Sequence, residues 1–140
     1  MTVKVKLIEG GKVPEFKTDG AVAMDCYARV PNGIVVDNGT RTTIPLGFAM
    51  ELPKGYELQI RPRSGLSKKG VDITLGTGDW DYIGEYGATV INNSGSPLNI
   101  FNGERICQCA VRKVPKVKVV LVDELKQTKR GSAGFGSTGV

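Results

Sequence analysis

The chain has 140 residues, of which 40% are hydrophobic and 24% charged, a composition ordinary for one globular domain with a single core. No apolar run approaches the ~20 residues needed to span a bilayer. The Lys-bearing start of the chain also lacks the apolar centre of a signal peptide. We therefore expect a cytoplasmic protein that does not bind membranes.

The net charge of +5 is modest, and the basic residues are scattered or paired, as at Lys68-Lys69 and Lys129-Arg130. This pattern favours a small anionic ligand over a nucleic acid, although most of these lysines could simply be solvated. The chain has no histidine, which excludes a Ser-His-Asp or Cys-His nucleophile and a His-ligated zinc. Its chemistry must depend on carboxylates, tyrosine, cations, backbone amides or a metal held by oxygen.

Short runs of alternating or β-branched residues recur about every ten residues, with Pro, Gly and Asn turn signals between them, as in a sandwich or barrel. The predicted strands are Val3–Ile8, Gly33–Val36, Thr42–Met50, Tyr56–Ile60, Ala88–Ile91, Leu98–Phe101, Arg105–Val111 and Val117–Val122. A helical turn is predicted only at Arg63–Lys69, after Pro62. The predicted fold class is therefore all-β.

Three cysteines, Cys26, Cys107 and Cys109, are too few and too unevenly placed for a disulfide framework. Cys107 and Cys109 share a face if they lie on one strand, and such neighbours rarely form a bridge. We interpret all three as small core residues in a reducing cytosol.

The loop Arg61-Pro-Arg-Ser-Gly-Leu66 ends a predicted strand with two arginines and opens a turn with Ser-Gly. It offers guanidinium, hydroxyl and N–H groups together, which suits a polyphosphate. By itself the hexapeptide could equally be a capped turn.

The loop Gly76–Glu85 carries two acids, Asp79 and Asp81, in a Gly-bounded hairpin. Both could be ordinary turn residues, because Asp and Gly dominate turns. Alternatively, one acid points into a cleft while the other stabilises the hairpin, and Tyr82 brings a flat ring near Asp79. Without a histidine, Asp79 is the natural general base for activating water.

Two further segments carry polar groups. Gly103–Cys109 is a turn leading into a strand, and its Gln108 offers an amide to a phosphate or a base. The last residues, Arg130–Val140, contain four glycines around Phe135, a composition that can wrap an anion and stack a ring on a base. A disordered Gly/Ser tail is the plain alternative.

In this order the segments resemble the five motifs of the trimeric dUTPase (deoxyuridine triphosphate nucleotidohydrolase) family. The matching segments are Val22–Asp25, Arg61–Leu66, Gly76–Glu85, Gly103–Gln108 and Arg130–Gly139. The resemblance implies a jelly-roll subunit in a homotrimer with shared active sites, which hydrolyses dUTP to dUMP and pyrophosphate with Mg²⁺. It also implies a domain over 1–129 and a mobile arm over 130–140 that closes over the site.

The resemblance further implies a role for each matching residue. Asp79 would orient or deprotonate the attacking water, and Tyr82 would lie under the deoxyribose and leave no room for a 2′-hydroxyl. The backbone from Ile73 to Gly76 would bind the uracil edge. Phe135 would stack on the base, and Asp25 would hold Mg²⁺ through water. The implied phosphate ligands are Arg63, Ser64, Gly65, Gln108, Arg130, Gly136, Ser137 and Thr138.

The chain departs from the family pattern at two places. Val22-Ala23 replace the usual Ala-Gly before the acid of the first motif, and Gly78 replaces the usual isoleucine before Asp79, which we expect to loosen the hairpin. The related dCTP deaminase would need a glutamate near Thr89 and a second serine in place of Gly65, and both are absent. A regulatory dUTPase-like protein without catalysis is a second alternative, but Asp79, Tyr82 and the tail are intact.

Overall fold

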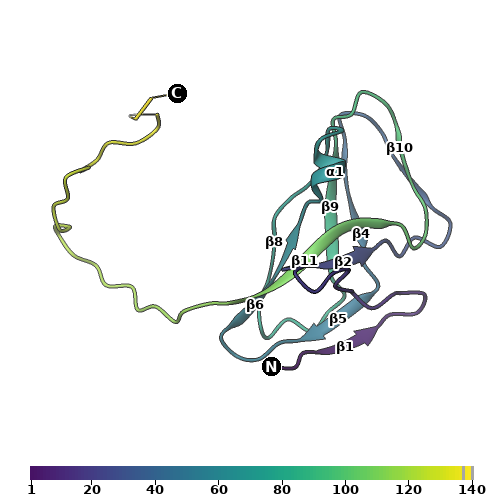
Figure 1. Cartoon of the computed structure of the whole chain (residues 1–140), viewed down its shortest axis with the longest axis horizontal. Coiled ribbons are helices and arrows are strands. Elements are labelled where there is room, and N and C mark those ends of the chain that lie inside the picture. Colours follow the sequence, from purple (N-terminus) through teal and green to yellow (C-terminus); the bar gives the residue numbers. More distant parts are fainter. Residues whose placement is uncertain (137, 140) are drawn as a thin grey trace.

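The computed structural model describes residues 1–136, 138 and 139, and almost all of its regular structure is β (Figure 1). The strands are β1 (Lys4–Leu7), β2 (Met24–Tyr27), β3 (Ile34–Val36), β4 (Arg41–Pro45), β5 (Phe48–Glu51), β6 (Tyr56–Arg61), β7 (Val71–Ile73), β8 (Gly76–Gly78), β9 (Gly87–Asn92), β10 (Leu98–Ile100) and β11 (Arg105–Lys113). One short helix, α1 (Ser64–Ser67), follows β6 within the described residues. The predicted all-β class is confirmed.

The described strands form a four-stranded sheet in the order β2-β11-β6-β8 and a three-stranded sheet in the order β4-β9-β7. Two further pairs, β1-β5 and β10-β3, complete the body. Each of these pairings is antiparallel, and most sheet neighbours are distant in sequence. Such crossover connections are typical of jelly rolls.

The period-two pattern of β6 shows how the sequence builds the core. Leu58 and Ile60 are buried on one face, and Glu57, Gln59 and Arg61 alternate with them on the other. Phe48, Ile44, Leu46, Met50, Leu58, Val36 and Val90 are among the largest fully buried side chains. The four-stranded sheet therefore covers the core with one face and presents a polar face outside.

The three cysteines are free and buried in this core, as the sequence predicted. Hydrogen bonding to the thiols of Cys107 and Cys109, together with burial, raises the pKa of the Cys26 thiol. The Cys26 thiol therefore remains protonated, and the three buried cysteines act as small apolar side chains.

Strand boundaries differ from the prediction in the first half of the chain. The single predicted strand Thr42–Met50 is two strands, β4 and β5, because the chain bends at Gly47, whose φ of 74° suits glycine. The short strands β2, β7 and β8 were not predicted. The Gly-Thr-Gly sequence of β8 has little β propensity of its own, and pairing with β6 imposes its conformation.

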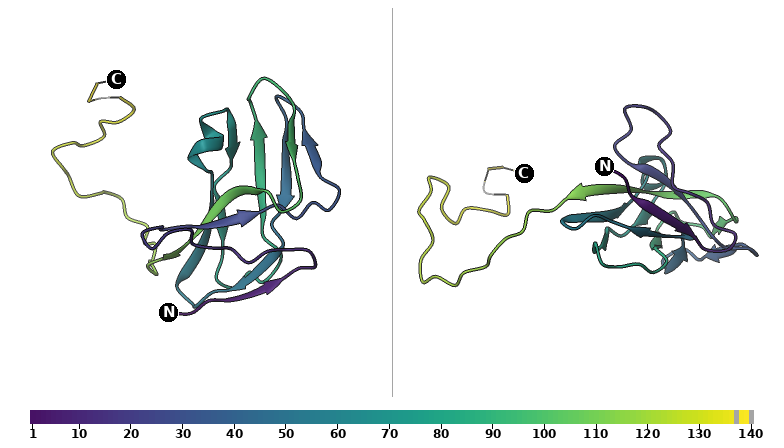
Figure 2. Two further views of the ribbon diagram at one scale, coloured as in Figure 1. Left: turned by 45° about the vertical axis from the view of Figure 1, so that its right-hand side comes forward. Right: turned by 90° about the horizontal axis from the view of Figure 1, so that it is seen from below.

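The predicted strand Val117–Val122 is wrong for the single chain. The Val114 N–H donates to the Gly55 carbonyl at 2.8 Å, and beyond this bond the chain leaves the body as an extended segment (Figures 1 and 2). A strand needs a neighbour for its backbone groups, and no described strand lies beside this segment. The predicted turn at Arg63–Lys69 is confirmed, since α1 lies inside it.

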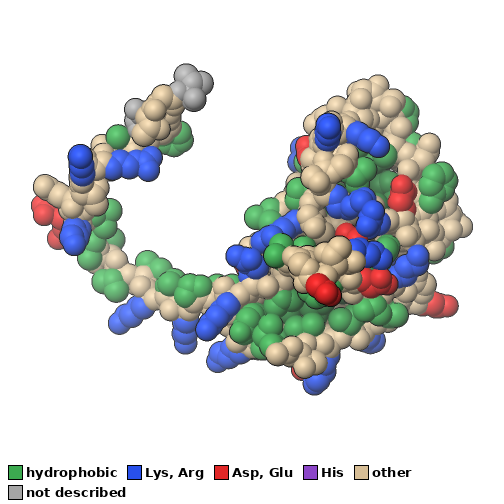
Figure 3. Space-filling view, in the orientation of Figure 1, with side chains coloured by type: hydrophobic (Ala, Val, Ile, Leu, Met, Phe, Trp, Pro, Cys, Tyr) green, Lys and Arg blue, Asp and Glu red, His purple; other side chains and the backbone are tan. Residues whose placement is uncertain are grey.

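At the start of the extended segment Lys116 and Lys118 alternate with valines, and the continuous apolar run Val119–Val122 follows. Figure 3 shows both kinds of side chain along this segment. Val119, Leu121 and Leu125 are 90%, 97% and 86% exposed. Soluble monomers rarely expose so many neighbouring apolar side chains. Among the described residues there is also no helix that is long and apolar enough to cross a membrane.

Candidate active site

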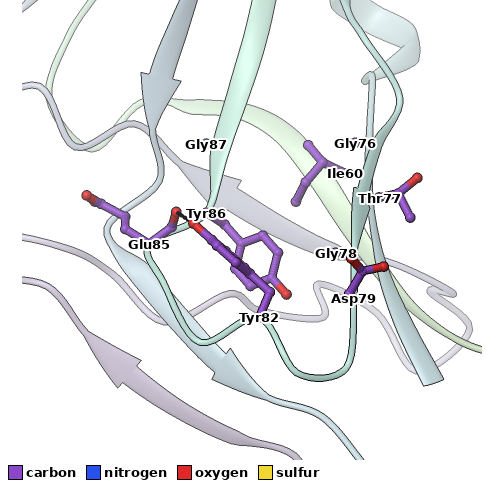
Figure 4. A pocket seen from close by; sticks show the side chains of 9 residues that line it. All are labelled: Ile60, Gly76, Thr77, Gly78, Asp79, Tyr82, Glu85, Tyr86 and Gly87. Atoms are coloured by element: carbon purple, nitrogen blue, oxygen red, sulfur yellow. Dashed lines mark hydrogen bonds between the residues drawn. The ribbon is translucent and has the colours of Figure 1, made fainter. Parts of the chain in front are cut away.

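A cavity of about 200 Å³ opens between β8 and the start of β9 (Figure 4). It is lined by Ile60, Gly76, Thr77, Gly78, Asp79, Tyr82, Glu85, Tyr86 and Gly87. The structure therefore brings Gly76, Asp79 and Tyr82 together, as the sequence predicted for these three. The predicted Ile73 lies at the end of β7, is 5% exposed, and does not line this cavity.

The predicted hairpin at Gly76–Glu85 is wrong: β8 pairs with β6, and β9 pairs with β4 and β7, so Asp79 lies on a loop between two sheets. This Asp79 loop is stabilised by its own hydrogen bonds. The Tyr82 N–H donates to the Asp79 carbonyl at 3.1 Å, which makes residues 79–82 a tight turn directly after β8. The Tyr82 hydroxyl donates to the Glu85 carbonyl at 2.8 Å. The Asp79 carboxylate is therefore exposed at the edge of the cavity, beside a tyrosine ring whose tip is fixed.

Tyr86 forms the floor of the cavity. Its ring stacks on Phe48 with a centroid separation of 5.4 Å and meets Tyr82 edge-on at 5.3 Å. Burial raises the pKa of Tyr86 to about 12, so its phenol stays neutral at physiological pH. The hydroxyl is buried without a hydrogen-bond partner in the structure.

A second and larger cavity, of about 530 Å³, lies on the other side of the Asp79 turn. Trp80 lines it together with Tyr56 and the first residues of the extended segment, Val114–Lys116. Asp79 borders both cavities. This carboxylate can therefore be approached by groups from either side.

The predicted phosphate ligands of the second and fourth motifs lie near the first motif, where β6 ends and α1 begins. Arg63, Ser64 and Gly65 open helix α1, and the Arg63 guanidinium donates to the Arg105 carbonyl at 2.9 Å. The Gln108 amide donates to the Pro62 carbonyl at 2.9 Å.

Asp25 belongs to the same group of residues. It pairs with Gln108 across β2 and β11, and its carboxylate forms an ion pair with Arg105 at 2.9 Å. Its side chain is 15% exposed.

These two groups of residues are separated within one chain. Gln108 pairs with Arg61, whereas Gly78, the residue before Asp79, pairs with Leu58. Three residues along β6 correspond to about 10 Å. A single chain therefore does not bring Asp79 to Gln108, Ser64 or Asp25.

The predicted tail residues lie still farther away. Arg130 donates within the tail to the Ala133 carbonyl at 2.7 Å, and Phe135 is fully exposed with a φ of 50°. Figure 1 shows this end of the chain separated from the body. Gly136 and Thr138 belong to the same extended end, and Ser137 lies outside the described residues.

The donor set around Asp25 limits how a metal can bind. No group of three or more Cys, Asp or Glu side chains in residues 1–136, 138 and 139 could hold a metal ion directly. Mg²⁺ commonly retains its waters and binds through one carboxylate plus substrate phosphates. A single carboxylate beside the predicted phosphate ligands fits that mode and does not form a metal cage.

Sequence reasoning missed several residues of the site. Ile60 enters the cavity through the pairing of β6 with β8, which no local pattern reveals. Glu85 and Tyr86 lie at the end of the Asp79 loop. The glycine at position 78, where the family usually has an isoleucine, was the only signal in the sequence that could have pointed to Tyr86. A Cβ on Gly78 would lie 2.5 Å from Cε1 of Tyr86, so the ring occupies the space that the larger residue would need.

An all-β subunit with a pocket beside an acidic loop and a separate Arg-Ser-Gly turn has the architecture of a jelly-roll nucleotide hydrolase. A family model described as dUTPase matches residues 9–139. The chain is 43% identical over 143 residues to the deoxyuridine 5'-triphosphate nucleotidohydrolase of Treponema denticola, covering 100% of this chain and 99% of the relative. The corresponding protein of Caldanaerobacter subterraneus is 41% identical over 146 residues, with 100% and 99% covered.

The fold is also similar to that of a dUTPase of Staphylococcus bacteriophage 80alpha solved with dUpNHpp. The TM-score is 0.91 over 99% of each chain, at 24% sequence identity. The chain belongs to the dUTPase family. The resemblance inferred from the five motifs and the jelly-roll-like fold class are thereby confirmed.

Proposed function

We propose that the cavity between β8 and Tyr86 is where this chain hydrolyses dUTP to dUMP and pyrophosphate, with Asp79 as the general base. The observation that carries this proposal is the exposed Asp79 carboxylate at the edge of a cavity lined by backbone and tyrosine. In a chain without histidine, a carboxylate is the natural group to accept the proton of a water that attacks the α-phosphorus.

The nucleoside would enter the cavity with its deoxyribose against the Tyr82 ring. Tyr82 is held at its hydroxyl by Glu85, so it cannot easily move aside for a 2′-hydroxyl. Backbone groups from Ile73 to Gly76 would bind the uracil edge. The Thr74 N–H already donates to the Thr89 carbonyl at 3.1 Å, so this amide is engaged within the sheet.

The triphosphate would be bound by Arg63, Ser64, Gly65 and Gln108, where guanidinium, hydroxyl and amide donors meet at the start of α1. The mobile arm, residues 130–140, would close over the domain formed by residues 1–129. Phe135 would then stack on the base, and Arg130, Gly136, Ser137 and Thr138 would contact the terminal phosphates.

Mg²⁺ would be carried on the triphosphate and held through water by Asp25. The ion would neutralise part of the phosphate charge. The pairing of Asp25 with Gln108 supports this assignment, because it places the carboxylate beside a proposed phosphate ligand.

Each complete site would be shared between subunits of a homotrimer. Two features support this: Asp79 is distant from Gln108 and Asp25 within one chain, and the apolar segment after Val114 has no partner in its own body. A neighbouring copy can supply both a strand edge for this segment and the missing half of the site. We also propose a cytoplasmic location, which the three free buried cysteines support.

The test is pyrophosphate release from dUTP, dCTP, dTTP and UTP measured side by side, with Asp79→Asn and Asp81→Asn as a matched pair. We expect turnover of dUTP alone, and a fall of 10²–10⁴-fold for Asp79→Asn, the usual cost of losing a general base. Asp81→Asn should stay close to the parent. A preference for dCTP, or equal activity of the two variants, would contradict the proposal.

A further inference from the structure

The carboxylate of Glu85 is gripped by residues from two distant segments. The Arg29 guanidinium, which follows β2, donates from Nε to Oε2 at 2.7 Å and from Nη2 to Oε1 at 2.6 Å. The Gly47 N–H, in the bend between β4 and β5, donates to Oε2 at 3.1 Å. Three charge-assisted bonds therefore fix this one side chain.

Among the ion-paired side chains of the described residues, only that of Asp25 is less exposed to solvent than those of Arg29 and Glu85. The side chains of Arg29 and Glu85 are 25% and 23% exposed, whereas those of the surface pair Lys4 and Glu51 are 77% and 65% exposed. The Arg29 guanidinium lowers the pKa of Glu85, so the carboxylate stays charged. A bidentate and shielded pair holds its geometry far better than a solvated one.

Gly47 packs closely against this pair. Its backbone has a φ of 74°, and a Cβ at this position would lie 3.3 Å from Cβ of Arg29. The arginine side chain therefore passes directly beside the bend that supplies the third donor. The backbone fold therefore brings Arg29 and Gly47 together around Glu85, at the end of the Asp79 loop.

The contacts of Glu85 also affect the cavity, because Glu85 binds Tyr82. Glu85 lines the small cavity, and its carbonyl accepts the Tyr82 hydroxyl at 2.8 Å. Tyr82 is 44% exposed, so packing alone does not fix its ring. The position of this ring depends on where the backbone of Glu85 is held.

We propose that Arg29 is a positioning residue for substrate selection: it holds Glu85, and through the Glu85 carbonyl it holds the Tyr82 ring against the sugar. This inference rests on the proposed function for the role of Tyr82. Arg29 lies outside the five motifs and does not itself line the cavity; it contacts the lining only through Glu85. Its effect should therefore appear in discrimination between sugars more than in the rate of the chemical step.

The experiment compares Arg29→Lys and Arg29→Met with Lys4→Met, which removes the solvated pair Lys4–Glu51. For each protein, kcat and KM are measured with dUTP and with UTP. We expect Arg29→Met to narrow the dUTP/UTP ratio of kcat/KM by about tenfold, mainly through KM for dUTP, with kcat nearly unchanged. Arg29→Lys keeps the charge and loses the bidentate geometry of the guanidinium, so its dUTP/UTP ratio should lie between those of the parent and Arg29→Met. Lys4→Met should have the same ratio as the parent.

A second measurement does not depend on activity. Tyr82 ring resonances in ¹³C-tyrosine-labelled protein, assigned by Tyr82→Phe, should shift in Arg29→Met and stay in place in Lys4→Met. An unchanged dUTP/UTP ratio with an unshifted Tyr82 ring would overturn the inference, even if Arg29→Met melts at a lower temperature. If the parent does not hydrolyse dUTP, the proposed function fails, and the ring resonances still decide whether Arg29 positions Tyr82.

Discussion

Gly78 and Tyr86 are complementary: the phenol ring of Tyr86 occupies the space where a side chain at position 78 would project. A Cβ on Gly78 would lie 2.5 Å from Cε1 and 2.6 Å from the hydroxyl oxygen of Tyr86. Figure 4 shows the Tyr86 and Tyr82 side chains beside the strand that carries Gly78 and Asp79. The glycine before the proposed general base is thus packed against an aromatic ring, and this contact opposes the loosening expected from its sequence.

Gly78→Ala should therefore destabilise the protein. The added methyl group would force Tyr86 or β8 to move, and overpacking of this kind costs about 1–3 kcal/mol of the free energy of unfolding. Urea unfolding measures the loss. Gly20→Ala is the matched control, because nothing lies within 4 Å of a Cβ there. Equal stability of the two variants would show that the Tyr86 ring moves aside freely.

Tyr86→Phe should change the alkaline stability of the fold. The pKa of Tyr86 is raised from 10.0 to about 12, so this residue's contribution is complete below pH 10 and is lost as the pH rises towards 12. Two pKa units correspond to about 3 kcal/mol in full, and about 2 kcal/mol of this is lost by pH 11.5. Urea unfolding at pH 9 and pH 11.5 should show this loss in the parent and a smaller one in Tyr86→Phe. If the parent and Tyr86→Phe lose the same free energy of unfolding between pH 9 and pH 11.5, groups other than Tyr86 cause the alkaline sensitivity.

At pH 7 the same variant should be as stable as the parent or more stable. The hydroxyl is buried without a partner, so its removal relieves a desolvation cost while the ring stays in place. A clear loss of stability in Tyr86→Phe at pH 7 would mean that the hydroxyl is hydrogen-bonded in solution.

Tyr82→Ala should narrow the difference in kcat/KM between dUTP and UTP, because the ring proposed to exclude the 2′-hydroxyl is removed. Trp80→Ala is the control: Trp80 is also 44% exposed and lies in the same turn, but it lines the other cavity. Steady-state kinetics with both nucleotides provide the comparison. If the ratio is unchanged in Tyr82→Ala, other residues exclude the ribose.

Mixed trimers should recover activity from two inactive proteins. Asp79→Asn has an intact tail, and a chain truncated after Lys129 has an intact Asp79 loop. If the Asp79 loop and tail of one site come from different chains, random co-refolding should restore about a quarter of the sites. Pyrophosphate release from dUTP measures the recovery. Mixed trimers that are confirmed by mass and remain fully inactive would rule out sharing of this kind.

Local patterns in the sequence were sufficient to predict the β class. Leu58 and Ile60 alternate with polar neighbours, and this signal needs no knowledge of partners. Strand β8 was missed because its conformation depends on pairing with β6, and Ile60 joined the site for the same reason. The Tyr86 ring fits beside β8 only because Gly78, eight residues earlier, has no side chain, and only the folded chain brings the two residues together.

The error at Val117–Val122 has a different origin. The run of β-branched residues there is a real β signal, but the described body of this chain has no strand beside the segment. The residues of the third motif and those of the second and fourth were likewise expected in one site, yet the chain holds them about three strand residues apart. Their spacing in sequence carries no information about which copy of the chain supplies each part.

If the chain assembles as proposed, the exposed segment after Val114 has a consequence for each newly made chain. Before assembly, a run of β-prone valines and leucines is open to solvent, and such runs promote the formation of unwanted intermolecular sheets. Lys116 and Lys118 interrupt the start of this run with positive charge, and charges of this kind act as gatekeepers against aggregation. The time that a chain spends unassembled, and hence its concentration during synthesis, should therefore determine how much protein reaches the native state.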